Sequence, residues 1–385
     1  MKHPWSPQHF RGEARKAGRP EIMIEAAVSA ASAIKRVHPD LPVIFTLHHL
    51  AHLAEVSADD LQQVAFRKVD AYRVFRVKKR GVPGMIPAQP RRYRTICVPQ
   101  QFLMQVQRWI AQNILNLIDP HPASFAFTPR RDLVGAAARH LGSRWLVKMD
   151  VRHFFESISE PQVYRVFRLL GYGALLSFQM ARICTRLPGH RPGALSRPLG
   201  RAEPGLPYRR HDPGHLPQGA PTSPMLANLT METLDRRLTG LARSEGWTYT
   251  RYADDLAFSR TDETSRIVAM RLAKQVAHQL ELVGLTHHRE KTSVVPPGAR
   301  KVLLGVLVDS DRPRLTRAFR NNVETHLFAL TSDKIGASAH RQKRGFASTI
   351  GMRRHIEGLI AFAHQVNPAY AAKLYARLNT VDWSR

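Results

Sequence analysis

Residues 248–260 read TYTRYADDLAFSR and place two adjacent acids, Asp254 and Asp255, inside sequence that otherwise resembles sheet. Thr and Tyr residues precede the acids and a Leu-Ala-Phe run follows them, which predicts two strands joined by a tight turn. Neighbouring carboxylates repel each other and lose hydration energy beside an apolar sheet. The pair therefore needs a compensating partner, and the question is what that partner is.

The whole chain is strongly basic. Among 385 residues, 58 are Lys or Arg and 30 are Asp or Glu, which gives a formal net charge of +28. An excess of this size opposes compaction unless a polyanion neutralises it. Basic residues recur along the chain rather than in one tail, so we expect an extended nucleic acid as partner. A membrane surface, or no anionic partner at all, are the weaker alternatives.

The composition is that of a globular protein, with 43% hydrophobic residues, and the length predicts two or three lobes. Cys97 and Cys184 belong to no metal or disulfide pattern, which suits a reducing cytosol. The N-terminal sequence has no apolar signal core, and no run approaches the roughly 20 apolar residues of a membrane span. We therefore expect a cytoplasmic protein without a membrane partner.

A third acid, Asp150, ends the short apolar strand predicted from RWLVKMD. If this strand neighbours the 248–260 hairpin, three carboxylates meet at the strand ends. Such a cluster suits two Mg²⁺ ions, or Mn²⁺ as a substitute, which about 3.5–4 Å apart would activate a hydroxyl and stabilise a leaving oxygen in phosphoryl transfer. A surface turn that merely reads Asp-Asp is the alternative that this motif alone leaves open.

Between the acids lies LPQGAPTSPMLANL, residues 216–229. Its prolines predict a stiff turn before a helix, Gly219 allows a ligand to approach the backbone, and Gln218 offers both a donor and an acceptor. The other expected elements are a flexible basic arm over 1–20, helices over 21–37, 101–118, 223–242 and 264–283, a basic hairpin over 72–99, a Pro/Gly/Arg-rich loop over 186–215, strands over 291–295 and 301–308, and helices from Arg317 onward.

Five ordered motifs carry a family resemblance: MDVRHFFESI, LPQGAPTSPMLANL, YTRYADDLAFS, LTHHREKT and LLGVLV. Together they resemble the palm of reverse transcriptases, and the second and third are most similar to bacterial retron-type enzymes. RRYRTICVP and FAFTPRRDL resemble the two finger motifs that precede the palm. The resemblance implies an α+β right-hand polymerase fold, with an N-terminal basic arm and helix (1–46), fingers (47–145), an antiparallel-sheet palm (146–312, including the 186–215 loop) and a small helical thumb (313–385).

The resemblance also implies catalytic roles. Asp150 and Asp255 would ligate the metal ions, and Asp254 would lie closest to both ions and to the primer terminus. Lys291 matches the lysine proposed to protonate the departing pyrophosphate, although an ordinary phosphate contact is the alternative.

Further roles concern nucleotide and template. Phe155 falls at the steric gate that excludes a ribose 2′-OH, with core packing beside Phe154 as the alternative. Arg94 would hold the triphosphate, since a guanidinium fork suits phosphate oxygens, and its neighbours Arg91 and Arg92 are candidates to share that task. The remaining assignments are Gln218 and Gly219 in the nucleotide pocket and Arg130 or Arg131 on the template.

Two motifs depart from the retron pattern. AAARH, residues 136–140, has Ala136 where retron enzymes carry Asn, while Ala137 and His140 are kept. Leu303-Leu304-Gly305 replaces a usual Val-Thr-Gly. In the family both elements are linked to recognition of the enzyme's own RNA, so the departures concern which RNA is bound and leave the polymerase chemistry untouched.

By resemblance, the chain copies a structured noncoding RNA into single-stranded DNA, primes from a 2′-OH of that RNA to give the branched product called msDNA, and serves antiphage defence with an effector protein. No nuclease domain is expected after the thumb, so a host RNase H would remove the template. The rival readings are another defence-associated reverse transcriptase, a group II intron enzyme, and a non-catalytic RNA-binding scaffold.

Overall fold

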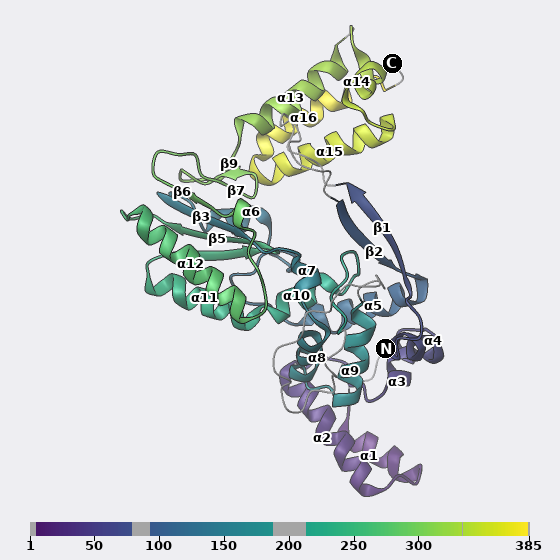
Figure 1. The fold of residues 1–385 in the computed structure, drawn as a ribbon. Coiled ribbons are helices and arrows are strands. Elements are labelled where there is room, and N and C mark those ends of the chain that lie inside the picture. Colours follow the sequence, from purple (N-terminus) through teal and green to yellow (C-terminus); the bar gives the residue numbers. More distant parts are fainter. Residues whose placement is uncertain (1–4, 79–92, 188–212, 333, 384–385) are drawn as a thin grey trace, which may run out of the picture. The chain divides into compact units, whose positions relative to one another are not determined.

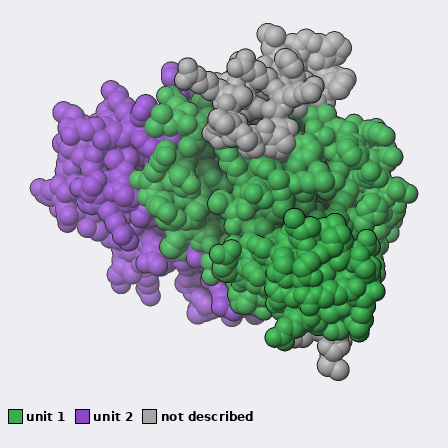
Figure 2. Space-filling model, turned by 90° about the horizontal axis from the view of Figure 1, so that it is seen from below, with its two compact units in different colours: residues 1–129, 151–237, 280–286 green, residues 130–150, 238–279, 287–385 purple. Residues whose placement is uncertain are grey.

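The computed structural model describes residues 5–78, 93–187, 213–332 and 334–383. The tip of the expected basic hairpin, with Arg91 and Arg92, and most of the 186–215 loop lie outside the described residues. The chain forms two compact units, which are coloured separately in Figure 2: unit 1 comprises residues 1–129, 151–237 and 280–286, and unit 2 comprises residues 130–150, 238–279 and 287–385. The linear boundaries expected for fingers, palm and thumb remain predictions.

Unit 1 is mainly helical, with its core formed by apolar side chains that recur at helical spacing on several helices. One face of α2, for example, buries Ile24, Val28, Ala31 and Ile34. Its elements are α1 (Pro7–Lys16), α2 (Glu21–Val37), α3 (Leu47–Leu53), α4 (Ala58–Ala65), β1 (Tyr72–Lys78), β2 (Tyr93–Pro99), α5 (Gln101–Asn113), η1 (Leu115–Leu117), α7 (Phe154–Ser157), α8 (Glu160–Leu169), α9 (Ala174–Cys184) and α10 (Ser223–Thr230) (Figure 1).

The flexible arm expected over residues 1–20 is wrong for α1. Pro7 occupies the first helical turn, where its missing N–H costs nothing. Arg11 and Arg15 are four residues apart on α1, and each forms an ion pair with an acid of α2, Glu25 and Glu21 respectively. These two ion pairs link α1 to α2, so the segment is a helical pair rather than an arm.

The predicted basic hairpin is confirmed. β1 and β2 pair antiparallel from Tyr72 opposite Pro99 to Lys78 opposite Tyr93. Beyond its base the hairpin is exposed on both faces, including the apolar side chains of Val74, Phe75 and Val77.

Unit 2 contains the predicted antiparallel sheet. β3 (Trp145–Asp150), β4 (Thr248–Tyr252), β5 (Asp255–Arg260) and β6 (Ser293–Val295) are ordered β4-β5-β3-β6, and every pair is antiparallel. Figure 1 shows α12 (Arg266–Leu282) along one face of this sheet and α6 (Leu133–Ala138) on the other. The fold is therefore of the mixed α+β class, as predicted.

A small second sheet completes the covered face. β7 (Val302–Leu303), β8 (Val306–Leu307) and β9 (Arg314–Leu315) form this sheet. Residues of β7 and β8 contribute to one apolar cluster with α6 and the large sheet, whereas Leu315 of β9 packs in the core of the C-terminal helices. The expected continuous strand over 301–308 is wrong, because Leu304 and Gly305 have φ of +50° and +87° and turn the chain between β7 and β8. A two-residue hairpin with both central residues at positive φ favours glycine, which explains Gly305. The cluster consists of Ala137, Leu146, Ala257, Leu303, Val306 and Val308.

The C-terminal helices are amphipathic, as predicted, and enclose a core of their own. α13 (Arg317–Thr331), α14 (Gly336–Arg344), α15 (Thr349–Val366) and α16 (Pro368–Asn379) bury one stripe each and expose Lys and Arg on other faces. The single helix expected over 223–242 is instead two, because α10 ends at Thr230 and α11 (Glu232–Ser244) begins after Met231. Within the described ranges no helix is both long and apolar enough to cross a bilayer.

The motif at residues 136–140 lies inside unit 2. Ala136 and Ala137 are fully buried, so an asparagine at position 136 would need hydrogen-bond partners that alanine does not. The His140 ring hydrogen-bonds Thr250 Oγ1 of β4 through Nε2 and Ser259 Oγ of β5 through Nδ1, each at 2.7 Å. This histidine therefore joins the two strands of the double-acid hairpin.

His140 should make the stability of the protein depend on pH. Burial lowers its pKa from 6.5 to about 4, so between these values the unfolded state binds more protons than the folded state, and stability falls as the pH drops. From about pH 7 to about pH 5 the loss should be about 2 kcal/mol of unfolding free energy. His140→Gln should remove this part of the pH dependence in denaturant titrations, whereas His364→Gln, which changes an exposed histidine, should leave it intact. Equal slopes for both variants would contradict the assignment.

Candidate active site

The register of the large sheet brings the three acids to one end. Asp150, the last residue of β3, lies directly opposite Asp255, the first residue of β5. Opposite residues of an antiparallel pair project from the same face, with Cβ atoms about 4.5–5.5 Å apart. Tyr252 also pairs with Asp255, so only Ala253 and Asp254 form the turn between β4 and β5. The predicted neighbourhood of these strands is confirmed.

The turn that carries Asp254 has a strained backbone. Ala253 has φ of +56°, a conformation that glycine adopts readily and alanine does not, at a cost of about 1–3 kcal/mol. Ala253 is buried, and the fully buried Arg251 donates from Nη1 to the Ala253 carbonyl oxygen at 3.3 Å. Surrounding packing therefore imposes the turn, which limits the positions open to the two acids after it.

The carboxylates of this site destabilise one another. The pKa of Asp255 is raised to about 6, first because the surrounding protein removes water from the carboxylate and then because Asp254 and Asp150 repel a further negative charge. Lys291 and Lys148 oppose this rise. At neutral pH Asp255 is still mainly ionised, and its charge is only partly compensated by protein groups.

Lys291 is a cation in direct contact with Asp150. Its Nζ donates to Asp150 Oδ2 at 2.6 Å, and its side chain is half exposed whereas that of Asp150 is 13% exposed. The short helix η2 (Arg289–Lys291) positions it, and the His288 amide just before η2 donates to the Asp150 carbonyl oxygen at 2.7 Å. Two predicted catalytic residues that are 141 positions apart thus meet.

Lys148 is a second cation near the acids, and sequence reasoning missed it. It lies two residues before Asp150 on β3, so both side chains project from the same face of the sheet. Its Nζ donates to the Val302 carbonyl oxygen at 3.1 Å, which keeps the ammonium on that face. The signal was present in the sequence, because alternation along a strand predicts this neighbourhood.

The acid cluster fits a hard divalent cation in its donor chemistry. It offers carboxylate oxygens, and the pKa of Asp255 is raised by burial and then by repulsion from Asp254 and Asp150, both of which a bound cation would offset. Within the described residues no three His, Cys, Asp or Glu side chains are already arranged as a ligand set. Asp150 would have to exchange the Lys291 ammonium for the cation. Ligation by Asp150, Asp254 and Asp255 therefore stays a prediction.

Two predicted nucleotide-pocket residues, Gln218 and Gly219, pack against β2, the strand that also carries Arg94. The Gln218 carbonyl oxygen accepts a hydrogen bond from the Cys97 amide of β2 at 2.8 Å, and Arg94 lies three residues from Cys97 on that strand. Gly219 has φ of +112°, and a Cβ there would lie 3.0 Å from the Cys97 carbonyl oxygen. Glycine is therefore required at position 219 for two reasons, the positive φ and the close approach of the β2 backbone.

Phe154 and Phe155 differ in the exposure of their side chains. Phe154 is 3% exposed and belongs to the core, whereas Phe155 is half-buried on α7. The core-packing alternative therefore describes Phe154 better than Phe155. Phe127, which is 49% exposed, has its ring centroid 6.3 Å from that of Phe155. Sequence reasoning quoted Phe127 within FAFTPRRDL without assigning it a role.

The proposed template residues lie in unit 2, just before α6. Arg130 is exposed and has φ of +63°, while Arg131 is half-buried. Asp132 follows them and caps α6 by accepting the Gly135 amide at 2.6 Å. Template contact by Arg130 or Arg131 stays a prediction.

Comparison with known proteins gives one family and several consistent relatives. Residues 77–308 match the family described as reverse transcriptase (RNA-dependent DNA polymerase). The Escherichia coli retron Ec86 reverse transcriptase is 28% identical over 298 residues, which cover 77% of this chain and 82% of that protein. The Myxococcus xanthus retron Mx162 and Mx65 reverse transcriptases are 30% and 32% identical, over 86% and 80% of this chain and 66% of each relative. Telomerase from Candida albicans, solved with a fragment of telomeric RNA, has a TM-score of 0.41 and 11% identity over 80% of this chain and 56% of its own, which is too distant to add an argument.

The acid cluster should bind Mn²⁺ without any nucleic acid present. Asp255→Asn keeps the shape of the side chain but removes one negative charge, so Mn²⁺ affinity measured by electron paramagnetic resonance should fall about tenfold or more. Asp262→Asn is the matched control, since it removes an exposed acid just beyond the other end of β5. Equal affinities of the two variants would show that Asp255 is no ligand.

Proposed function

This chain belongs to the reverse transcriptase family and is an RNA-directed DNA polymerase of the retron type with a right-hand fold, and from that premise we propose that it copies a structured noncoding RNA into single-stranded DNA at the Asp150–Asp254–Asp255 cluster. One observation carries the proposal. The β3–β5 register sets Asp150 opposite Asp255, with Asp254 in the adjoining turn and Lys291 in contact with Asp150.

The proposed chemistry is nucleotidyl transfer assisted by two divalent cations, with Mg²⁺ preferred. Asp150 and Asp255 would hold the cations, and Asp254 would lie nearest to the primer terminus. When bound, the cations supply activation of the attacking hydroxyl and compensation of charge on the leaving pyrophosphate. Lys291 would donate a proton to that pyrophosphate, because its ammonium lies at the same strand end as the acids.

The proposed nucleotide pocket selects and orients a dNTP. Arg94 would bind the triphosphate, and Gln218 and Gly219 would line the site. Phe155 would occupy the space that a ribose 2′-OH needs. Support comes from the hydrogen bond that ties residue 218 to the strand of Arg94, and from the half-buried position of Phe155.

The proposed partners follow from charge and relatives. A net charge of +28 suits a long RNA and its duplex with DNA, and Arg130 or Arg131 would contact the template. We propose priming from a 2′-OH of the same RNA, msDNA as the product, template removal by a host RNase H in the cytoplasm, and action with an effector protein in antiphage defence. These steps are expected from the resemblance to retron-type enzymes, to which the relatives named above add only that they are retron reverse transcriptases.

Sequencing of copurified nucleic acid tests the proposal. The protein should carry one dominant RNA together with single-stranded DNA complementary to part of it, joined through a 2′-linked branch. Asp254→Asn should retain the RNA and lose the DNA, because removing a charge from the metal cluster raises the barrier of transfer by several kcal/mol. Asp262→Asn should resemble the unchanged protein.

Three outcomes would replace the proposal. DNA on many unrelated templates would indicate another defence-associated reverse transcriptase, and intron RNA would indicate a group II enzyme. Equal primer extension by Asp254→Asn and the unchanged protein would favour an RNA-binding scaffold.

The steric-gate role predicts a change in sugar selectivity. Phe155→Ala should open space for a 2′-OH, so discrimination against ribonucleotides should fall about tenfold or more in single-nucleotide incorporation assays. Phe328→Ala, which truncates an exposed phenylalanine of α13, serves as control. Unchanged selectivity in Phe155→Ala would remove the residue from the gate.

A further inference from the structure

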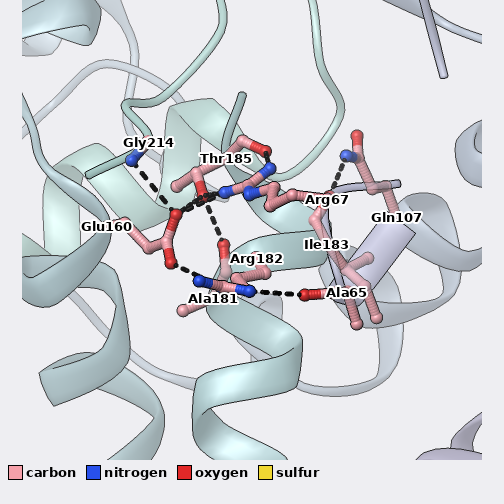
Figure 3. Close-up of polar contacts among 9 residues, drawn as sticks. All are labelled: Ala65, Arg67, Gln107, Glu160, Ala181, Arg182, Ile183, Thr185 and Gly214. Atoms are coloured by element: carbon pink, nitrogen blue, oxygen red, sulfur yellow. Dashed lines mark hydrogen bonds and ion pairs between the residues drawn. The ribbon is translucent and has the colours of Figure 1, made fainter. Parts of the chain in front are cut away.

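A buried carboxylate, Glu160, joins several segments of unit 1 that carry no assigned role. Glu160 is the first residue of α8 and is 2% exposed. Its Oε2 accepts hydrogen bonds from Arg67 Nη2, from Thr185 Oγ1 at 3.1 Å and from the Gly214 amide at 3.1 Å, and its Oε1 accepts from Arg182 Nε at 3.1 Å (Figure 3).

Further hydrogen bonds hold the two arginines in place, so a displaced Glu160 carboxylate would lose its ion pairs with them. Arg67 donates to the Thr185 carbonyl oxygen and to Thr185 Oγ1, each at 2.7 Å. Arg182 donates from Nη1 to the Ala65 carbonyl oxygen at 3.0 Å. Figure 3 shows both guanidinium groups converging on the same carboxylate. A mostly buried carboxylate with two cationic partners is costly to alter, because any loss leaves a charge without compensation.

Backbone hydrogen bonds join the segment around Glu160 to residues 214–216, which immediately precede the nucleotide-pocket turn. The Glu160 amide donates to the Gly214 carbonyl oxygen at 2.7 Å, and the Leu216 amide donates to the Ile158 carbonyl oxygen at 3.0 Å. On the other side, His215 and Arg186 exchange two backbone hydrogen bonds of 2.9 Å. Residues 214–216 thus lie between two backbone partners, with the Glu160 carboxylate at one end.

Gly214 is the closest point of contact between the carboxylate and this segment. A Cβ at position 214 would lie 2.6 Å from both Arg67 Nη2 and Glu160 Oε2 and 2.8 Å from Thr185 Oγ1. No side chain fits there without displacing the ion pairs, so the network and the path of residues 214–216 depend on each other.

Residues 216–218 connect this segment to the proposed nucleotide pocket and are held by hydrogen bonds. Leu216 is followed by Pro217, whose carbonyl oxygen accepts from Ser223 Oγ at 2.7 Å, and then by Gln218, which is bonded to Cys97 of β2. In the other direction, Phe155 lies five residues before Glu160 on the adjoining α7. Glu160 therefore stands between the proposed gate and the proposed nucleotide turn.

We propose that Glu160 is a positioning residue for the nucleotide pocket. Its ion pairs with Arg67 and Arg182 set the position of Gly214, and through residues 214–216 they set Gln218 and Gly219 against β2. Glu160 touches no substrate and acts only through these residues. The inference rests on the proposed function, since it assigns a support to the same nucleotide site.

The test uses the full-length protein on a preformed primer–template, with KM for dNTP, kcat, Kd for the primer–template and thermal unfolding measured in parallel. In Glu160→Gln the KM for dNTP should rise about tenfold or more while kcat stays within about threefold, because a displaced pocket weakens ground-state binding of the nucleotide. Kd for the primer–template should not change. A support needed only for folding would not change KM selectively.

Two variants serve as comparison. Gly214→Ala retains every charge and pushes a methyl group into the network, so it should reproduce the rise in KM. Asp70→Asn is the matched control, since Asp70 pairs with Arg186 at 2.6 Å beside the same segment but makes no bond to Glu160. It should behave like the unchanged protein.

Several results would overturn the inference. One is an unchanged KM for dNTP in folded Glu160→Gln or Gly214→Ala. Another is a loss of kcat and of primer–template affinity as large as the rise in KM, because the effect would then not be specific to the nucleotide. If Glu160→Gln does not fold, Gly214→Ala decides, and unfolding of both would assign the network to stability alone. A failure of the proposed function differs from all of these, because the unchanged protein would then extend no primer.

Discussion

Burial and mutual repulsion of three carboxylates at one end of the large sheet are the constraint that the sheet and its neighbouring segments must accommodate. Asp150 and Asp255 are opposite each other because β3 and β5 pair in that register, and a slip of one residue would send one of them to the other face. The sheet tolerates the resulting electrostatic cost because Lys291 and Lys148 offset part of it. A cation bound by these carboxylates would offset the repulsion that remains.

The covered face of the sheet keeps that register in place. Small residues of α6 allow close packing against β3 and β5, and the buried His140 bonds a side chain from each strand of the hairpin. Residues 136–140 and 303–305, which family resemblance links to RNA recognition, are in this structure supports of the sheet. Ala138, Arg139 and Gly305 are nevertheless exposed within these two segments.

Local patterns were enough to predict much of this architecture. Alternation and turn residues predicted the double-acid hairpin, apolar periodicity predicted α2 and the C-terminal helices, and a strand ending in an acid predicted the place of Asp150. Contacts between distant segments left no such pattern. Arg67 is 93 positions from Glu160 and 118 positions from Thr185, so the sequence around each residue gives no indication of its partners. The helix α1 was also missed, because its pairing with α2 depends on charges in two separate segments. The hydrogen bond between Gln218 and Cys97 likewise depends on tertiary packing.

The double hydrogen bond between Arg186 and His215 closes the base of the chain segment between them. Both residues belong to unit 1, so each end of the segment is anchored to the other within that unit. The chain therefore enters the pocket turn from a fixed point, because His215 is anchored only two residues before Pro217 and three before Gln218.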